Sequence, residues 1–438
     1  MPEWPSTHNP FSTGFGSQPP VLVGRDNELG LIRAGLGSGP GSKHFCNVLI
    51  GQRGYGKTVL LGKMREEANE HGWPVIEVNC STGTALQEID SRGRAILARH
   101  YSSLLDRIAA RVKGGGVSVL GAGAHIDFDL SEGGATSFSD LLAALGAAAK
   151  EKDQGVLLLV DEMHNLALQD MRVLAATLQS VTNGLEYPIA CIGAGLPQLE
   201  DIIIGDEAIS FFHRCDRLSL GAVADSDIAQ GMGIPISQNG GEIPSAVLEK
   251  AVAYVAGYPY KLQMLGHHLW SASADMGHRI THEHLESAKA RVDAELDKHI
   301  YQTIWKLVSV PSRNFLEALL ECGGASTMPE IQRRLRVGMA DVERCRDELA
   351  SHELVEHDNG EWVLATETIP GHVLSRYLAK RHIAGEGAAV SRLQPVSVPG
   401  DMRPLSPSGA ACGLWMPRKH ANCVLAVGHK GRCRSKAR

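Results

Sequence analysis

A short segment of glycines and charged residues constrains the fold more than any other part of the sequence. It lies between an apolar run that ends at Ile50 and a stretch of helical periodicity, and it reads Gly51-Gln52-Arg53-Gly54-Tyr55-Gly56-Lys57-Thr58. In the order strand, glycine loop, helix, the backbone N–H groups and the positive end of the helix face one point, which suits a phosphate. A glycine-rich turn formed by chance does not account for both the motif and its context. We therefore predict a nucleotide-binding α/β domain.

Three residues at the end of this segment have distinct expected roles. Lys57 is expected to reach the β- and γ-phosphates of ATP, and the Thr58 hydroxyl is expected to meet Mg²⁺. Val59 follows them in the first helical turn and is expected to line the same site.

A second motif places two acids at the end of a buried strand. Five aliphatic residues, Val156–Val160, precede Asp161 and Glu162, and ligands bind at the carboxyl ends of the strands in open α/β sheets. Asp161 is expected to hold Mg²⁺, and Glu162 to act as the general base that polarises the attacking water. His164 and Asn165 follow after Met163. They either position water or nucleotide, or form a polar turn.

Apolar runs and helical stretches divide the chain into parts. The runs at 44–50, 73–80, 156–161, 188–195 and 216–220 lack alternation, which favours a parallel sheet covered on both faces. Residues 299–384 predict three helices and a hairpin around Asp358-Asn359-Gly360, the order of a winged helix-turn-helix. The expected parts are a flexible arm at 1–20, an α/β domain at 21–221, a helical lid at 222–298, the winged helix at 299–384, a linker at 385–410 and a basic tail at 411–438.

Composition excludes several classes of protein. The 438 residues carry a formal net charge of −6, so the chain as a whole is not a polycation that seeks nucleic acid. No aliphatic stretch approaches the roughly 20 residues of a membrane span, and the N-terminus lacks the basic start and apolar run of a secretory signal. The sequence thus predicts a cytoplasmic protein without a membrane partner. Of its nine cysteines, those outside the tail are expected to be small buried residues.

The C-terminal tail contains the residues of a metal site. Cys412, Cys423, His429 and Cys433 follow the spacing C-x10-C-x5-H-x3-C, with His420 as a spare ligand. Three thiolates and an imidazole complete a tetrahedral Zn²⁺ shell, and so short a segment would hardly fold without such a clamp. The alternative is a disordered tail with incidental cysteines. The tail also has seven Lys and Arg residues and no acid, a basic patch suited to phosphate or to an acidic partner.

The charge of the predicted winged helix leaves its partner open. Residues 299–383 hold ten basic and twelve acidic side chains, whereas affinity for nucleic acid comes from Lys and Arg. Arg333, Arg334 and Arg336 form one basic cluster, which a solvated helix face explains equally well. Contact with a protein is therefore as reasonable as reading a DNA groove.

Five motifs together resemble the AAA+ ATPases, in the branch that includes the STAND signalling ATPases and the origin-recognition initiators. They are Val23-Gly24-Arg25-Asp26-Asn27-Glu28-Leu29, GQRGYGKT, LLLVDEMHNL, PIACIGAGLPQL and Gly257-Tyr258-Pro259. The resemblance covers residues 21–384 and implies a parallel sheet of order 5-1-4-3-2, a helical lid and a C-terminal winged helix. It also implies that Val23, Gly24 and Arg25 lie against the adenine and that Pro259 of the lid responds to the nucleotide. For Arg25, a lead-in to the helix cap is an equal alternative.

The sequence departs from this family at two places. Many AAA+ proteins have a polar sensor at the end of the fourth strand, where this chain has Ile192-Gly193-Ala194-Gly195. The arginine usual in the lid is replaced by Tyr260, with Lys261 next to it. Both changes favour a slow switch over a fast hydrolase. Gly257 and Pro259 are also explained as the stop of one helix and the start of the next.

One arginine before the fifth strand suggests assembly. Arg214 is the best-placed candidate for an arginine finger, and Arg217 is second. Because a neighbouring subunit commonly supplies such a finger, the pattern predicts a homo-oligomer. A surface salt bridge is the alternative for either arginine.

The sequence as a whole predicts a slow, Mg²⁺-dependent ATP hydrolase that acts as a nucleotide-controlled regulatory switch, with ATP and Mg²⁺ as cofactors and Zn²⁺ in the tail. The alternative is a DNA-associated ATPase, loader or transcriptional regulator that uses the winged helix and the basic tail.

Overall fold

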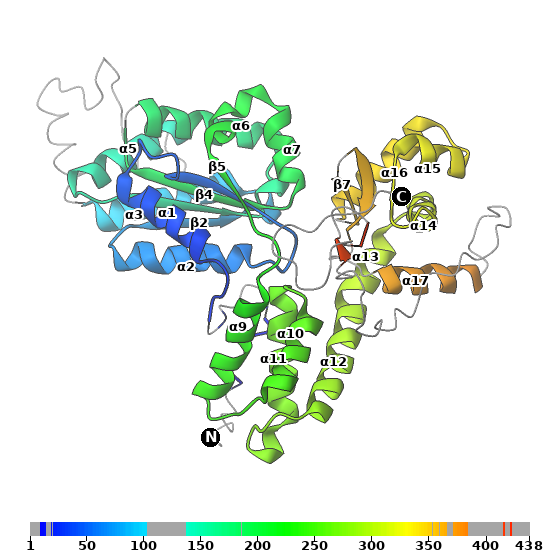
Figure 1. The fold of residues 1–438 in the computed structure, drawn as a ribbon. Helices are drawn as coiled ribbons and strands as arrows, with labels where there is room; N and C mark the ends of the chain where they lie inside the picture. The colour runs from blue at the N-terminus through cyan, green and yellow to red at the C-terminus, as the bar shows by residue number, and fades with distance from the viewer. Residues whose placement is uncertain are drawn as a thin grey trace, which may run out of the picture. The chain divides into compact units, whose positions relative to one another are not determined.

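The chain divides into two compact units, Met1–Ile300 and Tyr301–Arg438, which Figure 1 shows as ribbons. The first contains a parallel sheet with its helices and a helical lid, and the second contains helices and a small antiparallel sheet. The computed structural model describes residues 9–14, 19, 21–102, 137–184, 186–352, 354–358, 360–365, 371–383, 415–416 and 421–422.

The centre of the first unit is a parallel sheet of five strands in the order β2-β3-β4-β1-β5. The strands are β1 (Cys46–Ile50), β2 (Val75–Asn79), β3 (Val156–Asp161), β4 (Ile189–Gly195) and β5 (Asp216–Ser219). The predicted order 5-1-4-3-2 is confirmed, since it is the same order counted from the other edge. β1, β3 and β4 are buried at every position, as expected for strands covered on both faces.

Helices connect the strands and form the two covering layers. In Figure 1, α2 lies on one face of the sheet and α6 on the other. The helices are α1 (Asp26–Ser38), α2 (Lys57–Glu70), α3 (Ala85–His100), α5 (Phe138–Glu151), α6 (Leu168–Leu178), α7 (Gln198–Gly205) and α8 (Ser210–Arg214). Short helical turns are η1 (Cys80–Thr82), η2 (Met163–Asn165), η3 (Gln179–Gly184) and η4 (Glu207–Ile209).

A helical segment follows β5, in the part of the chain where the sequence predicts a lid. Its elements are α9 (Asp225–Gln238), α10 (Ser245–Val255), α11 (Pro259–Ala272), η5 (Ala274–Met276) and α12 (His282–Leu296), with η6 (Asp297–Tyr301) after them. Thr281 caps α12, because its Oγ1 accepts a hydrogen bond of 3.3 Å from the His284 N–H. Pro259 is in the first turn of α11, where its missing N–H costs nothing.

Part of the N-terminal arm is bound to this lid. The Phe11 ring is 4% exposed, and a Cβ built on Gly266 of α11 would lie 2.4 Å from it. Asn9 Nδ2 donates to the His267 carbonyl oxygen at 3.0 Å, and the Ser12 N–H donates to Gln263 Oε1 at 3.2 Å. Residues 9–14 therefore differ from the flexible arm expected for 1–20, because a buried aromatic ring anchors them against a glycine.

The second unit packs helices against a three-stranded antiparallel sheet of order β6-β8-β7. Three helices followed by a hairpin occur here in the predicted order. Glu348 ties two of the helices together, since its Oε2 accepts from the hydroxyls of Ser309 at 2.6 Å and Ser312 at 2.7 Å. The elements are α13 (Gln302–Leu307), α14 (Val310–Glu321), β6 (Ala325–Ser326), α15 (Met328–Leu335), α16 (Met339–Ser351), β7 (Val355–Asp358), β8 (Glu361–Leu364), α17 (Gly371–Ile383), β9 (Trp415–Met416) and β10 (Ala421–Asn422).

We expect Leu159→Ala to destabilise the sheet, because Leu159 on β3 is 0% exposed. Truncating a buried leucine lowers the free energy of unfolding by about 2–5 kcal/mol. The matched control is Leu168→Ala on α6, where the side chain is 43% exposed and truncation costs about 0.5 kcal/mol or less. Urea denaturation followed by circular dichroism measures both variants. Equal midpoints for the two would contradict the buried position of β3.

Candidate functional site

The glycine-rich segment forms the loop between β1 and α2. Its first residue, Gly51, packs closely against the backbone of Leu220, since a Cβ at Gly51 would lie 2.5 Å from the Leu220 carbonyl oxygen. Lys57 begins α2 and is 6% exposed. Its Nζ donates to the carbonyl oxygens of Gly51 at 2.7 Å and Gln52 at 2.9 Å. The ammonium group is thus held inside the curve of the loop, where a phosphate would lie.

The two motifs of the sequence meet in one hydrogen bond. Thr58 Oγ1 donates to Asp161 Oδ2 at 2.8 Å, and the Glu162 N–H donates to Asp161 Oδ1 at 2.8 Å. Asp161 is 7% exposed, and burial raises the pKa of its carboxyl above the ordinary value, while the Thr58 bond opposes this shift. A hydroxyl and a carboxylate are oxygen ligands of the kind that Mg²⁺ prefers. The donor set therefore fits this ion.

The acid after Asp161 is held on both its backbone and its side chain. Glu162 has φ 53°, in the left-handed region. His164 Nε2 lies 3.3 Å from Glu162 Oε2, and His164 Nδ1 accepts a hydrogen bond of 3.4 Å from the Leu196 N–H. Burial, together with the charges of Lys57 and Arg53, lowers the pKa of His164 to about 4, so its imidazole is neutral at neutral pH.

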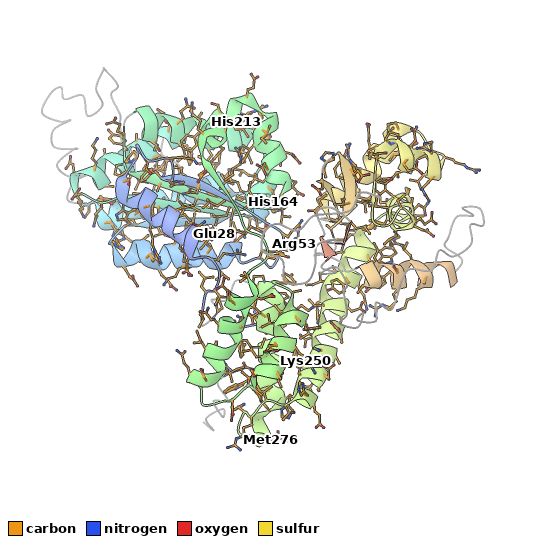
Figure 2. The ribbon with its side chains drawn as sticks, in the orientation of Figure 1. Glu28, Arg53, His164, His213, Lys250 and Met276 are labelled. Atoms are coloured by element: carbon orange, nitrogen blue, oxygen red, sulfur yellow. The ribbon has the colours of Figure 1, made fainter. Side chains whose placement is uncertain are left out.

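The side chains of His164 and Asn165 have different surroundings. Figure 2 shows His164 and Arg53 close to each other, consistent with the influence of the Arg53 charge on the histidine. Asn165, in contrast, has its Nδ2 3.4 Å from Ser81 Oγ on η1. Of the two polar residues of η2, His164 contacts Glu162, and Asn165 forms part of a polar turn.

Arg25 links the glycine loop to the start of the lid. It is 5% exposed, and its Nη2 donates to the carbonyl oxygens of Tyr55 at 3.1 Å and Gly221 at 2.7 Å. Val23 packs on α9, since a Cβ on Gly231 would lie 3.0 Å from its side chain. Gly24 has a positive φ of 65°. These residues lie where sheet, loop and lid meet, and their contact with adenine stays a prediction.

The lid contacts the tip of the loop through tyrosines. The rings of Tyr55 and Tyr258 have centroids 5.3 Å apart, and the Tyr260 N–H donates to the Gly54 carbonyl oxygen at 3.2 Å. Gly54 has φ 79°, and a Cβ there would lie 2.4 Å from the Tyr258 hydroxyl. The segment around Pro259 therefore rests directly on the loop.

This tyrosine contact was not predicted from the sequence. Its only local sign is an aromatic residue, Tyr55, inside a loop that otherwise contains glycines and polar residues. Tyr258 flanks the proline of a distant motif. Nothing in either local pattern indicates that the two residues meet, because the contact depends on how the lid packs.

The two departures from the family pattern are visible in the structure. Lys261 is turned into the lid, since its Nζ donates to the Tyr254 carbonyl oxygen at 2.7 Å and lies 3.8 Å from the centre of that ring. Burial lowers the pKa of Lys261. At the end of β4, a Cβ on Gly193 would lie 2.6 Å from Met163 Sδ. The space of a sensor side chain is thus filled by η2.

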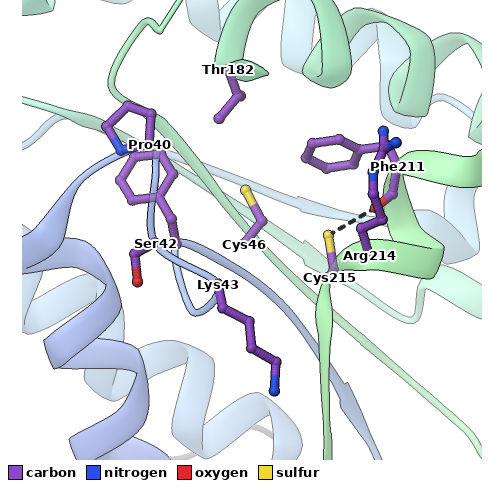
Figure 3. Close-up of a pocket in the computed structure, with 9 residues that line it drawn as sticks. Pro40, Ser42, Lys43, Cys46, Thr182, Phe211, Arg214 and Cys215 are labelled. Carbon is purple, nitrogen blue, oxygen red and sulfur yellow. Dashed lines mark hydrogen bonds between the residues drawn. The ribbon is translucent and has the colours of Figure 1, made fainter.

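Arg214 lies away from the loop of its own chain. It ends α8, before β5, whereas the loop follows β1, and β1 and β5 run parallel. The two therefore lie at opposite ends of these neighbouring strands. Arg214 is exposed, but Arg217 is held by Glu200 Oε1, 3.1 Å from its Nε. Arg214 lines a cavity of about 80 Å³ together with Pro40, Lys43, Cys46, Thr182 and Phe211, and Figure 3 draws these side chains.

The predicted zinc ligands Cys412, Cys423, His429 and Cys433 lie outside the described residues, so the zinc site stays a prediction. Within the described ranges, no three His, Cys, Asp or Glu side chains gather as metal ligands. The cysteines described are free, and all but Cys322 are buried. In this same part of the chain, no helix is both long and apolar enough to cross a membrane.

Comparison with known proteins gives the class of the first unit. Residues 21–192 match the family model of the AAA ATPase domain, while no curated protein matches the sequence. The fold is similar to that of the Walker-type ATPase PABY2304 of Pyrococcus abyssi, with 17% identity and a TM-score of 0.54 over 81% of this chain and 96% of that one. It is also similar to the Aeropyrum pernix ORC2 protein, with 16% identity and a TM-score of 0.55 over 85% and 98%. Residues 21–192 thus carry an AAA ATPase domain, and the two solved structures share its fold.

We expect Gly54→Ala to weaken ATP binding. The methyl group would meet Tyr258, and alanine would be strained at a φ of 79°. The free loop can move to relieve this strain, whereas ATP binding requires the loop in its present shape. A strain on the order of 1–3 kcal/mol would then lower the affinity by about fivefold to a hundredfold. The matched control is Gly37→Ala on α1, where a Cβ meets nothing within 4 Å. Titration with a fluorescent ATP analogue measures both, and equal affinities would contradict this geometry.

Proposed function

We propose that this protein is a nucleotide-controlled switch that binds ATP with Mg²⁺ and hydrolyses it slowly. The observation that carries the proposal is the 2.8 Å hydrogen bond from Thr58 to Asp161, which joins the glycine loop to the acid pair. Chance occurrence of either motif would not bring their side chains together. The AAA ATPase family match of residues 21–192 supports the same chemistry.

The residues of the site have separate roles in this proposal. Lys57 neutralises charge on the phosphates, and Thr58 and Asp161 hold Mg²⁺, which supplies further positive charge there. Glu162 accepts a proton from the attacking water through its carboxylate. Its side chain is 30% exposed, so water can reach it while Asp161 is kept for the metal.

Slow turnover and a response of the lid follow from two features. The β4 end has no polar side chain in Ile192–Gly195, and Lys261 is bonded within the lid, so neither can stabilise a transferring phosphoryl group. The lid segment around Pro259 contacts Gly54 of the loop. A change in the loop on binding or losing nucleotide therefore reaches α11 directly.

We propose further that the second unit is a winged helix and that its partner is a protein. Four of its arginines are paired with acids of the same unit: Arg333 with Glu330, Arg334 with Glu321 and Glu330, Arg344 with Asp341, and Arg346 with Asp347. Paired cations are poor ligands for phosphates. The DNA-associated alternative then depends on the tail at 411–438 and stays a prediction.

Arg214 supports a homo-oligomer in this proposal. It is exposed at the amino ends of the strands, whereas the loop of its own chain lies at their carboxyl ends, so the loop that it serves belongs to a second copy. Arg217 is the weaker candidate, because Glu200 already holds its guanidinium.

Glu162→Gln should abolish hydrolysis while ATP binding persists, because glutamine accepts no proton from water. Lys57→Ala should lose binding as well, since the phosphates lose their cation. Single-turnover hydrolysis and ATP titration, each with and without duplex DNA, separate these steps. Hydrolysis unchanged in Glu162→Gln would contradict the assigned base. A rate raised by DNA would favour the DNA-associated alternative.

Arg214→Ala should slow hydrolysis by up to about 10³-fold, with Arg217→Ala as the matched control near the wild-type rate. Mixing Arg214→Ala with Lys57→Ala subunits should restore activity, because one supplies an intact loop and the other an intact finger. Steady-state rates at several protein concentrations measure both effects. A rate independent of concentration and unchanged by Arg214→Ala would rule out a finger supplied between subunits.

A further inference from the structure

The acid Glu162 has a side-chain neighbour that the proposed function leaves without a role. His164 lies on η2, and its side chain is only 3% exposed. Its Nδ1 accepts a hydrogen bond from the Leu196 N–H at 3.4 Å, so in the neutral ring the proton is on Nε2. That nitrogen lies 3.3 Å from Glu162 Oε2. The imidazole therefore stands between the end of β4 and the carboxylate of the acid.

The glycines that replace a polar sensor at the end of β4 make this arrangement fit. A Cβ on Gly193 would lie 2.6 Å from Met163 Sδ, and a Cβ on Gly195 would lie 3.4 Å from the His164 backbone nitrogen. A larger side chain at Gly193 would have to displace the Met163 side chain of η2. The glycines at the end of β4 thus leave the space in which η2, and with it His164, packs.

We propose that His164 is a positioning residue for hydrolysis, which fixes one oxygen of Glu162 through its Nε2–H and leaves the other oxygen for the attacking water. The proposal rests on the assignment of Glu162 as the base. The histidine itself touches neither nucleotide nor water in this role. This role requires no positive charge on the imidazole. Burial lowers the pKa of His164 to about 4, so the ring is a neutral hydrogen-bond donor at neutral pH.

Two substitutions separate the two ends of the imidazole. The oxygen of asparagine reaches about as far as Nδ1, so His164→Asn keeps an acceptor for the Leu196 N–H and loses the donor to Glu162. The nitrogen of glutamine reaches about as far as Nε2, so His164→Gln keeps the donor and loses the acceptor. A purely structural role, which depends on the bond to Leu196, predicts that asparagine is the milder change. The positioning role predicts the opposite order.

We expect His164→Asn to lower the single-turnover rate by about tenfold to a hundredfold, as is typical when a partner that orients a reacting group is lost. The KM for ATP and the melting temperature should be unchanged. His164→Gln should retain a rate within a few-fold of wild type. In the Glu162→Gln background, His164→Asn should cause no further loss, because two residues that act as a unit are not additive.

Each outcome has a distinct meaning for the two proposals. If hydrolysis depends on Glu162 but His164→Asn is as fast as wild type or faster, the positioning role is wrong and the proposed function stands. Equal losses in the asparagine and glutamine variants would also overturn the positioning role. If the wild-type protein shows no hydrolysis that Glu162→Gln removes, the proposed function is wrong, and the positioning role fails with it.

Discussion

The hydrogen bond from Thr58 to Asp161 is the contact on which the site depends, because it spans an intervening strand. β4 lies between β1 and β3 in the sheet, so the loop after β1 and the acids after β3 are not direct neighbours. Helix α2 starts at the end of the loop and packs over β3 and β4, which carries Thr58 across. The direction of one helix thus decides whether two separate motifs form a single site.

The lid is attached to the same loop by contacts of two kinds. Arg25 donates to the carbonyl oxygens of Tyr55 and Gly221, which fixes the loop to the segment where the chain enters the lid. Tyr258 and Tyr260 then cover Gly54 from the start of α11. Because these contacts converge on a few residues of the loop, the lid cannot turn without changing the surroundings of Gly54 and Tyr55. Coupling between the site and the lid is therefore built into side-chain packing.

The fold was largely predictable from the sequence, because the three central strands β1, β3 and β4 lie in apolar runs and the loop has a specific motif. The order of the strands came from the family resemblance, not from periodicity. The contacts of Phe11 with Gly266, of Tyr55 with Tyr258 and of His164 with Leu196 were not predictable. Each contact joins segments that are distant in the chain. It depends on how two surfaces fit together, which the local sequence of either segment does not indicate.

The electrostatics of the site explain why it should bind a charged nucleotide with its metal. Burial of Asp161 raises the pKa of its carboxyl, so the protein alone disfavours the ionised form. Lys57, also buried, donates to two backbone carbonyl oxygens. A divalent cation beside Asp161 would favour its charged form, and a phosphate inside the loop would receive the Lys57 ammonium. Burying Asp161 and Lys57 costs free energy in folding, and the binding of a metal cation and a phosphate together offsets this cost.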